Sequence, residues 1–354
     1  MTVFNHPEFQ HEQVHFCQDK ASGLNAIIAI HNTRLGPALG GCRMYPYNND
    51  ETALTDVLKL SRSMTYKAAM AGLAYGGGKA VIIGDPSTDK NEAMLQAMGH
   101  FIEQLNGHYI TAEDVGTSVS DLLTIAKRTH YVAGISDKLT STGSPRSGDP
   151  SPATAYGVFV GIKVAVEQRL GYGHLAGLKV SIQGLGKVGY QLAVLLHDAG
   201  VKLYVSDLNV QHLQKAVTEL DATPLSPQQL LQTQTDIFAP CAMGGILDES
   251  LIEQLPVVII AGSANNQLAT ERIGELLHQR GILYAPDFVI NAGGLIDIAH
   301  ELGIHNPKQV HRQLDNIGHT LTEIFKCSQQ QNCPTHSIAC SISEERIHQV
   351  MDAA

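Results

Sequence analysis

One segment restricts the possible folds of this chain more than any other. Residues 178–182 (LKVSI) read as a buried strand, residues 184–189 (GLGKVG) have the spacing GxGxxG, and residues 187–198 have the apolar spacing of a helix. In such a turn the glycines permit a tight bend, close approach of a pyrophosphate and packing of helix on strand, while the helix N-terminus attracts phosphate. The segment predicts a dinucleotide site in a doubly wound sheet. Its expected contacts are Gly184, Gly186, Lys187, Val188 and Gly189.

An acidic residue follows the next predicted strand, at residues 201–206. Asp207 lies 23 positions after Gly184 (207 − 184 = 23). A carboxylate there accepts hydrogen bonds from the adenine ribose hydroxyls and repels a 2′-phosphate. Asp207 therefore predicts NAD rather than NADP.

Strand-like and helical patterns alternate along the rest of the chain, which predicts an α/β fold with parallel strands. Before the glycine turn, residues 26–31, 79–83 and 109–111 read as strands, and residues 51–72 and 91–105 as helices. The run TSTGSPRSGDPSP at residues 140–152 reads as a loop or domain hinge. The polar tail from about residue 307 reads as helices interrupted near residues 328–336.

Composition excludes several classes of function. The chain has 24 Lys+Arg against 34 Asp+Glu and a formal net charge of −10, which argues against nucleic acid or an anionic membrane as partner. No apolar run is long enough for a transmembrane helix, and residues 1–18 do not resemble a signal peptide. The six cysteines form no CxxC pair and the histidines no tight ligand cluster. We expect a cytoplasmic, reduced protein without a bound metal.

Two lysines and two carboxylates before the hinge are candidates for chemistry. Lys79 follows three glycines and opens an apolar strand, where burial and a nearby cation such as Lys67 would lower its pKa. The triple glycine also suggests close backbone approach to something small. The residues alone leave open a pair of surface lysines around a turn. Glu113 and Asp114 end a predicted strand, where they could cap a helix or provide a general base.

At this point the chain resembles the glutamate/leucine/phenylalanine/valine dehydrogenase family, and most closely its leucine-oxidising branch. The resemblance runs in order along nearly the whole chain. It rests on GPALGGCRMYPY (36–47), LSRSMTYKAAMAGLAYGGGKAVIIGDP (60–86), LNGHYITAEDVGT (105–117), PATAYGV (152–158), VSIQGLGKVG (180–189), DIFAPCAMGG (236–245), AGSANNQL (261–268) and YAPDFVINAGG (284–294).

The resemblance implies an N-terminal α/β substrate domain, residues 1–143, completed by C-terminal helices at about 328–354. It implies a Rossmann-type NAD-binding domain at residues 144–327, with catalysis in the cleft between the domains. Lys67, with the backbone at Gly40 and Gly41, would hold the substrate α-carboxylate. Lys79 would be the low-pKa lysine that activates water, and Asp114 would exchange protons with the amino group.

Further positions match the family's cofactor-lining residues: Thr154, Ala239, Cys241, Asn265 and Asn291. For Cys241 we favour an apolar packing role over a nucleophilic one. The implied cofactor is NAD, and the implied small molecules are an L-amino acid, its 2-oxo acid and ammonium. The family also implies a homo-oligomer.

The resemblance also bears on specificity. Glutamate-oxidising members have a lysine before the glycine pair, where this chain has Leu39. An apolar pocket would leave a γ-carboxylate unpaired, so we expect an aliphatic substrate, with leucine foremost. The implied pocket residues are Leu39, Met64, Ala112, Leu295 and Ile298.

The alternatives are oxidation of valine or phenylalanine on the same fold and, remotely, a non-catalytic NAD-binding regulator. Two departures from the family pattern bear on the expectation. Asp297 stands where an asparagine is usual, and would add charge to the pocket if it faced it. The loop at residues 144–149 looks longer, which could alter closure or cofactor contacts.

Overall fold

The computed structural model describes residues 5–139, 145–146, 148–242, 244–303 and 306–349. The chain forms two compact units. Unit 1 contains Met1–Asp149, Asp297–Lys308 and Ser343–Ala354, and unit 2 contains Pro150–Ile296 and Gln309–Ile342. The first boundary lies at residues 149/150, six residues beyond the expected one. Residues 297–308 belong to unit 1. Of the C-terminal helices expected to complete the substrate domain, at about residues 328–354, only the residues from 343 onward belong to unit 1.

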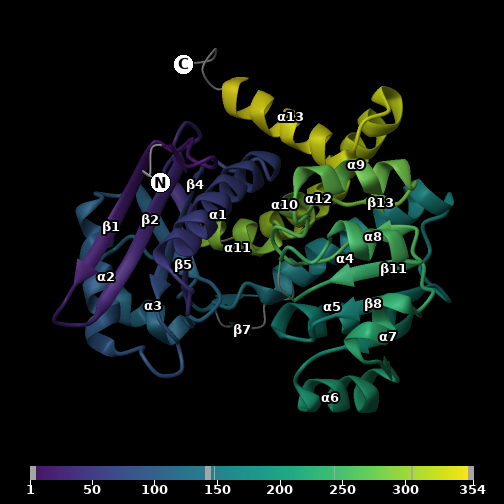
Figure 1. Cartoon of the computed structure of the whole chain (residues 1–354), viewed down its shortest axis with the longest axis horizontal. Coiled ribbons are helices and arrows are strands. Elements are labelled where there is room, and N and C mark those ends of the chain that lie inside the picture. Colours follow the sequence, from purple (N-terminus) through teal and green to yellow (C-terminus); the bar gives the residue numbers. More distant parts are fainter. Residues whose placement is uncertain (1–4, 140–144, 147, 243, 304–305, 350–354) are drawn as a thin grey trace. The chain divides into compact units, whose positions relative to one another are not determined.

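Unit 1 contains a five-stranded mixed sheet in the order β1-β2-β4-β3-β5 (Figure 1). β1–β2 and β2–β4 pair antiparallel, whereas β3 pairs parallel with both β4 and β5. The elements of this part of the chain are β1 (Gln13–Asp19), β2 (Leu24–Asn32), β3 (Ala38–Tyr45), α1 (Asp50–Met70), β4 (Gly76–Ile83), α2 (Glu92–Gln104), β5 (Tyr109–Glu113), α3 (Val119–Ile125), β6 (Lys138–Leu139) and β7 (Pro145–Arg146).

Side-chain alternation divides this sheet into two apolar faces. Ile28 and Ile82 pack with residues of α2 and α3, whereas Ile27 and Val81, one position away on the same strands, pack with residues of α1. Figure 1 shows α1 over one face and α2 with α3 on the other. Lys79 lies two residues before Val81 and so belongs to the α1 face.

Two strands of this sheet were not anticipated, and the sheet is mixed rather than wholly parallel. β3 (ALGGCRMY) contains two glycines, which weaken any strand pattern. β1 (QVHFCQD) mixes polar residues with the exposed Phe16. The sheet is mixed because β2 runs antiparallel to both of its neighbours, β1 and β4.

Unit 2 is built around a six-stranded parallel sheet in the order β10-β9-β8-β11-β12-β13. Numbered from its first strand this order is 3-2-1-4-5-6, that of a dinucleotide-binding doubly wound fold. Its elements are α4 (Ser151–Leu170), β8 (Lys179–Gln183), α5 (Lys187–Asp198), β9 (Lys202–Ser206), α6 (Val210–Leu220), β10 (Thr223–Pro224), α7 (Pro227–Gln232), β11 (Ile237–Pro240), α8 (Glu249–Gln254), β12 (Ile259–Ile260), α9 (Glu271–Gln279), β13 (Leu283–Tyr284) and α10 (Asp287–Ile290). The chain then continues through α11 (Gly293–Glu301), α12 (Pro307–Gln331) and α13 (Thr335–Gln349).

Two histidines pack between α1 and the sheet of unit 1. The His11 ring lies 4.9 Å from the His31 ring, centroid to centroid. His11 Nε2 is 2.7 Å from Ser61 Oγ, and His31 Nδ1 is 2.8 Å from Thr65 Oγ1. Burial, the largest cause, lowers the pKa of His11 to about 4 and that of His31 to about 3. Both rings are therefore neutral at pH 7.

This pair predicts a loss of stability in acid. The unfolded chain binds protons at these rings near pH 6.5 and the folded chain does not. The contribution of each neutral ring to the free energy of unfolding is therefore fully present above that pH and is lost as the pH falls toward 4. The loss is about 1–2 kcal/mol per ring between pH 7 and pH 5. We expect His31→Asn, which keeps a polar partner for Thr65 but cannot titrate, to lose less stability over this interval than the wild type.

Urea unfolding at pH 7 and pH 5 measures this difference. His174→Asn, at an exposed position in unit 2, is the matched control and should retain the wild-type pH dependence. Equal pH dependence in His31→Asn and the wild type would contradict the assignment.

Candidate functional site

A buried ion pair lies on the α1 face of the sheet in unit 1. Lys79 Nζ on β4 is 2.8 Å from Oδ2 of Asp114, which directly follows β5. The two side chains are only 5% and 13% exposed. Burial by itself would raise the pKa of Asp114, but Lys79 and Arg43 overcome this effect and hold it well below its ordinary value. The structure thus joins two of the predicted catalytic residues in one contact.

Arg43 is a member of this cluster that sequence reasoning missed. Its Nε donates to Asp114 Oδ2 at 3.1 Å, and its Nη1 donates to Asp56 Oδ2 of α1 at 2.9 Å. The Tyr47 hydroxyl donates to the same Asp56 oxygen at 2.5 Å. The second cation that contacts Asp114, beside Lys79, is therefore Arg43, whereas the sequence suggested Lys67 as the cation near Lys79. The arginine in GGCRMY was the only sequence signal for it.

The glycines of β3 and β4 bring the strands and α1 close together. A Cβ on Gly40 would lie 1.8 Å from the carbonyl oxygen of Gly78, and one on Gly77 would lie 2.1 Å from the amide nitrogen of Thr65. A Cβ on Gly41 would lie 2.8 Å from that of Asp114. The triple glycine was expected to admit something small, but this expectation was wrong for Gly77, because that residue is closely covered by the chain's own helix.

Lys67 and Met64 come from α1, which covers the same face of the sheet. Lys67 is only 7% exposed, so most of the residue is buried in unit 1. Met64 Cγ would lie 3.4 Å from a Cβ on Gly40, so Met64 packs over the glycine pair. Gly41 pairs with Ala112 in the β3–β5 register.

Four of the five apolar residues expected around a substrate side chain are buried, and Met64 is partly buried. Leu39, Ala112 and Ile298 belong to unit 1, and Leu295 belongs to unit 2. Asp297 was flagged as a possible charge in this pocket. Its carboxylate is instead fully buried and pairs with Lys138 Nζ at 2.9 Å. The expected longer loop at residues 144–149 includes residues 144 and 147, which lie outside the described part of the chain.

The glycine turn of unit 2 has the geometry that its sequence predicts. Gly184 has φ +94°, and a Cβ on Gly189 would lie 2.0 Å from the Gly184 carbonyl oxygen. A Cβ on Gly186 would meet nothing within 4 Å, so space remains beside the turn. α5 begins here with Lys187 and Val188, and no side chain caps its N-terminus. These features fit a dinucleotide pyrophosphate.

Asp207 follows β9 and contacts the glycine turn. Its Oδ2 accepts from the Leu185 amide at 2.5 Å, and its Oδ1 accepts from the Asn209 amide at 2.7 Å. His212 Nδ1 lies 3.5 Å from Oδ2. The carboxylate therefore stabilises the backbone of the glycine turn. The sequence also predicts that it contacts the adenine ribose.

The remaining predicted cofactor residues also lie in unit 2. Asn291 Nδ2 donates to Asn265 Oδ1 at 2.9 Å, so these two amides are joined. Thr154 Oγ1 donates to the Pro150 carbonyl at 3.1 Å, and Ala239 is buried in β11. Burial raises the pKa of the Cys241 thiol, which keeps it protonated at neutral pH.

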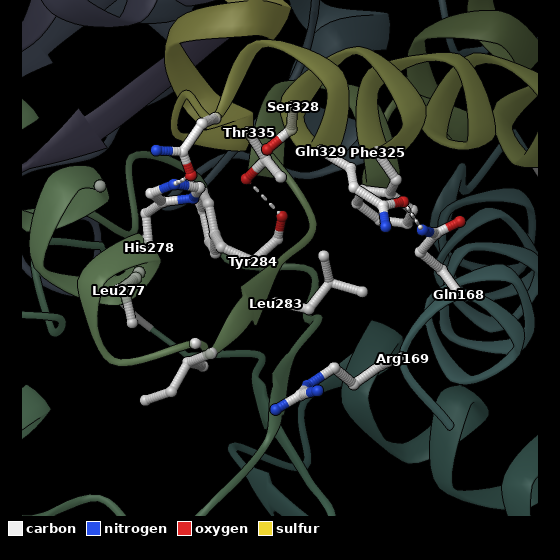
Figure 2. A pocket seen from close by; sticks show the side chains of 14 residues that line it. Gln168, Arg169, Leu277, His278, Leu283, Tyr284, Phe325, Ser328, Gln329 and Thr335 are labelled. Carbon is white, nitrogen blue, oxygen red and sulfur yellow. Dashed lines mark hydrogen bonds between the residues drawn. The ribbon is translucent and has the colours of Figure 1, made fainter. Parts of the chain in front are cut away.

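A hollow of about 300 Å³ in unit 2 contains none of the predicted residues. In Figure 2 Thr335 points to the backbone of Tyr284, to which its hydroxyl donates at 2.7 Å, and Gln168 meets Gln329. We assign it no part in the chemistry. Among the described residues, no group of three or more His, Cys, Asp or Glu could hold a metal, and no helix could cross a membrane.

Two family models match the chain. Residues 11–131 match "Glu/Leu/Phe/Val dehydrogenase, dimerisation domain", and residues 204–354 match "Glutamate/Leucine/Phenylalanine/Valine dehydrogenase". The first range contains Lys67, Lys79 and Asp114, and the second contains Asp207.

Characterised relatives match over almost their whole length. Leucine dehydrogenase of Geobacillus stearothermophilus is 50% identical over all of this chain and 95% of its own. L-tryptophan dehydrogenase of Nostoc punctiforme is 46% identical over 96% of this chain and 94% of its own. The crystal structure titled L-tryptophan dehydrogenase from Nostoc punctiforme superposes with a TM-score of 0.79 at 44% identity, covering 97% of this chain and 98% of that one.

The buried ion pair of unit 1, the parallel sheet and glycine turn of unit 2, and these matches agree with one another. The chain belongs to the glutamate/leucine/phenylalanine/valine dehydrogenase family, and it is an amino acid dehydrogenase that uses a nicotinamide cofactor.

Proposed function

We propose that the protein catalyses the reversible, NAD-dependent oxidative deamination of an aliphatic L-amino acid, with L-leucine the preferred substrate. An amino acid, NAD⁺ and water give the 2-oxo acid, ammonium, NADH and a proton. The observation that carries the proposal is the buried contact between Lys79 and Asp114, at 2.8 Å, on the face of the sheet that α1 covers. The 50% identity to a leucine dehydrogenase over the full chain supports the choice of leucine.

Unit 1 supplies the groups that hold the substrate and move protons. Lys67, with the backbone at Gly40 and Gly41, binds the α-carboxylate. Asp114 accepts a hydrogen bond from the substrate's amino group. Because its pKa is held low by Lys79 and Arg43, this carboxylate passes a proton on rather than keeping it.

Unit 2 supplies the binding site for the cofactor. Gly184, Gly186 and Gly189 with the first turn of α5 hold its pyrophosphate, and Asp207 holds its adenine ribose. Ala239, Cys241, Asn265 and Asn291, with Thr154, line the rest. When bound, the nicotinamide ring accepts the hydride that leaves the substrate's Cα.

Lys79 then acts on the carbon that has lost its hydride. Lys79 acts in its neutral form, after its ammonium has released a proton to water. It takes a proton from the attacking water as the C–O bond forms and donates this proton to the amine of the adduct. As the C–N bond breaks, the hydroxyl of the adduct loses its proton to the Lys79 amine, ammonia leaves and takes up that proton to become ammonium, and the 2-oxo acid remains. Through its 3.1 Å contact, Arg43 helps to keep the pKa of Asp114 low, so this carboxylate gives up each proton that it takes from the amino group.

Specificity follows from apolar contacts. Leu39, Ala112, Leu295 and Ile298 receive the substrate side chain, and Met64 lies beside the glycine pair. A γ-carboxylate in such surroundings would have no partner, so glutamate is disfavoured. The buried pairing of Asp297 with Lys138 supports an apolar pocket, because that charge is already compensated.

A substrate comparison tests the proposal directly. We expect the highest kcat/KM with NAD for L-leucine, followed by L-isoleucine and L-valine, and negligible oxidation of L-glutamate. L-phenylalanine and L-tryptophan belong in the comparison because relatives about 45% identical carry those names. A clear preference for either aromatic would overturn the aliphatic assignment, and inactivity with all six would overturn the function.

Removal of the lysine amine should abolish turnover. We expect Lys79→Ala to lose at least about 10²-fold in kcat for L-leucine, the lower end of general acid–base catalysis, with NAD binding unchanged. Steady-state kinetics and NAD titration measure the two effects. Lys127→Ala, which breaks an exposed ion pair with Glu92, is the control and should retain wild-type rates. A Lys79→Ala enzyme within tenfold of wild type would show that another group moves the proton.

Asp207 should set the choice between NAD and NADP. We expect the wild type to prefer NAD by at least about 10²-fold in kcat/KM. Asp207→Asn keeps an oxygen acceptor for the glycine turn but removes the charge, so it should narrow this preference mainly through the KM of the cofactor. Asp198→Asn, at a side chain 70% exposed in the same unit, is the matched control. An unchanged preference in Asp207→Asn would place ribose selection elsewhere.

Self-assembly belongs to the proposal as well. The family model matched by residues 11–131 is described as a dimerisation domain, which supports a homo-oligomer. Light scattering of the purified protein tests this part, and a mass of one chain at micromolar concentration would contradict it.

A further inference from the structure

Three charged side chains are buried together in unit 1, outside the groups that the reaction uses. Lys138 Nζ lies 2.9 Å from Asp297 Oδ2 and 2.8 Å from Glu301 Oε2. Lys138 is 1% exposed, Asp297 0% and Glu301 8%. Removal of three charges from water is costly, so such a cluster persists where the fold holds its members in one geometry.

The cluster ties a loop to one side of α11. Asp297 and Glu301 are four residues apart on this helix and so lie on the same side of it. Glu301 Oε1 also accepts from the backbone amides of Ile135 and Ser136, both at 3.0 Å. Lys138 donates in addition to the Asp297 carbonyl at 3.5 Å. We call Lys138, Asp297 and Glu301, with these two amides, the clamp.

The other end of the same loop is joined to β5. The Thr111 amide donates to the Tyr131 carbonyl at 2.9 Å, and the Ala133 amide donates to the Thr111 carbonyl at 2.8 Å. Thr111 precedes Ala112, one of the residues proposed to contact the substrate. The stretch from Tyr131 to Lys138 therefore connects the strand that carries Ala112 and Asp114 to α11.

Ile298 lies at the point where this connection meets the helix. A Cβ on Gly134 would be 3.7 Å from Ile298 Cγ1, which is ordinary van der Waals contact. Gly134 has φ +79°, a conformation that favours glycine. Ile298 thus packs against the middle of the loop. One end of this loop is hydrogen-bonded to β5, and the clamp attaches the other end to α11.

We propose that the clamp positions Ile298 relative to β5 and thereby sets the length of the apolar pocket for the substrate side chain. Asp297 is a positioning residue in this scheme and not a ligand of the substrate. The proposal rests on the proposed function insofar as Ile298 contacts the substrate. A shift of a pocket wall by one methylene changes discrimination among aliphatic side chains, so the clamp determines specificity without touching the substrate.

The test compares variants of the clamp with a matched surface change. Lys138→Met removes the buried cation, and Lys127→Met removes the cation of the exposed pair with Glu92. Asp297→Leu removes one of the two carboxylates that contact Lys138, whereas Asp297→Asn keeps an acceptor at that position. Steady-state kinetics with L-leucine, L-valine and L-lysine give kcat and KM, and the KM of NAD is measured alongside. Hydrogen exchange reports on residues 131–138 and 297–301.

We expect Lys138→Met and Asp297→Leu to change the leucine-to-valine ratio of kcat/KM at least about fivefold, mainly through the KM of the amino acid, with the KM of NAD within about twofold. Exchange at residues 131–138 and 297–301 should accelerate in both. Asp297→Asn and Lys127→Met should keep the wild-type ratio. If Lys138→Met does not fold, the comparison of Asp297→Leu with Asp297→Asn decides by the same ratio.

Other results would overturn the proposal. A proportional loss for all substrates, with only a lower melting temperature, would make the clamp purely structural. Oxidation of L-lysine by the wild type that Asp297→Asn loses would make Asp297 a substrate ligand. If the wild type oxidises no amino acid, the proposed function fails, and unchanged exchange in both clamp-breaking variants would separately reject the clamp.

Discussion

The close approach of β3, β4 and α1 is the constraint on which the rest of unit 1 depends. Gly40 and Gly77 touch backbone atoms of neighbouring elements so closely that no side chain fits at either position. This packing brings a lysine of β4, an arginine of β3 and the aspartate after β5 onto one face of the sheet. Without it, the ammonium of Lys79 and the carboxylate of Asp114 could not lie in contact at 2.8 Å.

Buried charges compensate one another in two clusters of unit 1. One cluster has an excess of positive charge and the other an excess of negative charge. In the first cluster one carboxylate, Asp114, contacts two cations, Lys79 and Arg43. In the clamp one cation, Lys138, meets two carboxylates. The first arrangement keeps a carboxylate ionised, and the second attaches the loop at residues 131–138 to one side of α11. In the roles that we propose, the first ion pair serves proton transfer and the second serves the geometry of the substrate pocket.

Much of the fold could be predicted from local pattern, and the helix after the glycine turn was predicted residue for residue at 187–198. The apolar periodicity of this helix, the glycines before it and Gly200 after it all indicate the same bounds. β3 escaped detection because its two glycines are required by close packing that only the folded chain reveals. The partners of the charged residues could not be predicted from local pattern for a related reason. Lys138 and Asp297 are 159 positions apart. Arg43 reaches Asp114 because β3 pairs with β5, and it reaches Asp56 because α1 packs on the sheet.

The late return of the chain to unit 1 has a consequence for biosynthesis. In the last turns of α13 the Arg346 guanidinium donates to the Met70 carbonyl at 3.1 Å, at the C-terminal end of α1, and Glu344 accepts from the Tyr66 hydroxyl at 2.9 Å. Tyr66 and Met70 lie on either side of Lys67 in α1. Their partners, Glu344 and Arg346, leave the ribosome only after the whole of unit 2 has been made. Unit 2 can therefore reach its native packing during translation, apart from residues 309–342, while α1 waits for its final contacts. A nascent chain stalled before residue 343 would still lack these contacts at the C-terminal end of α1.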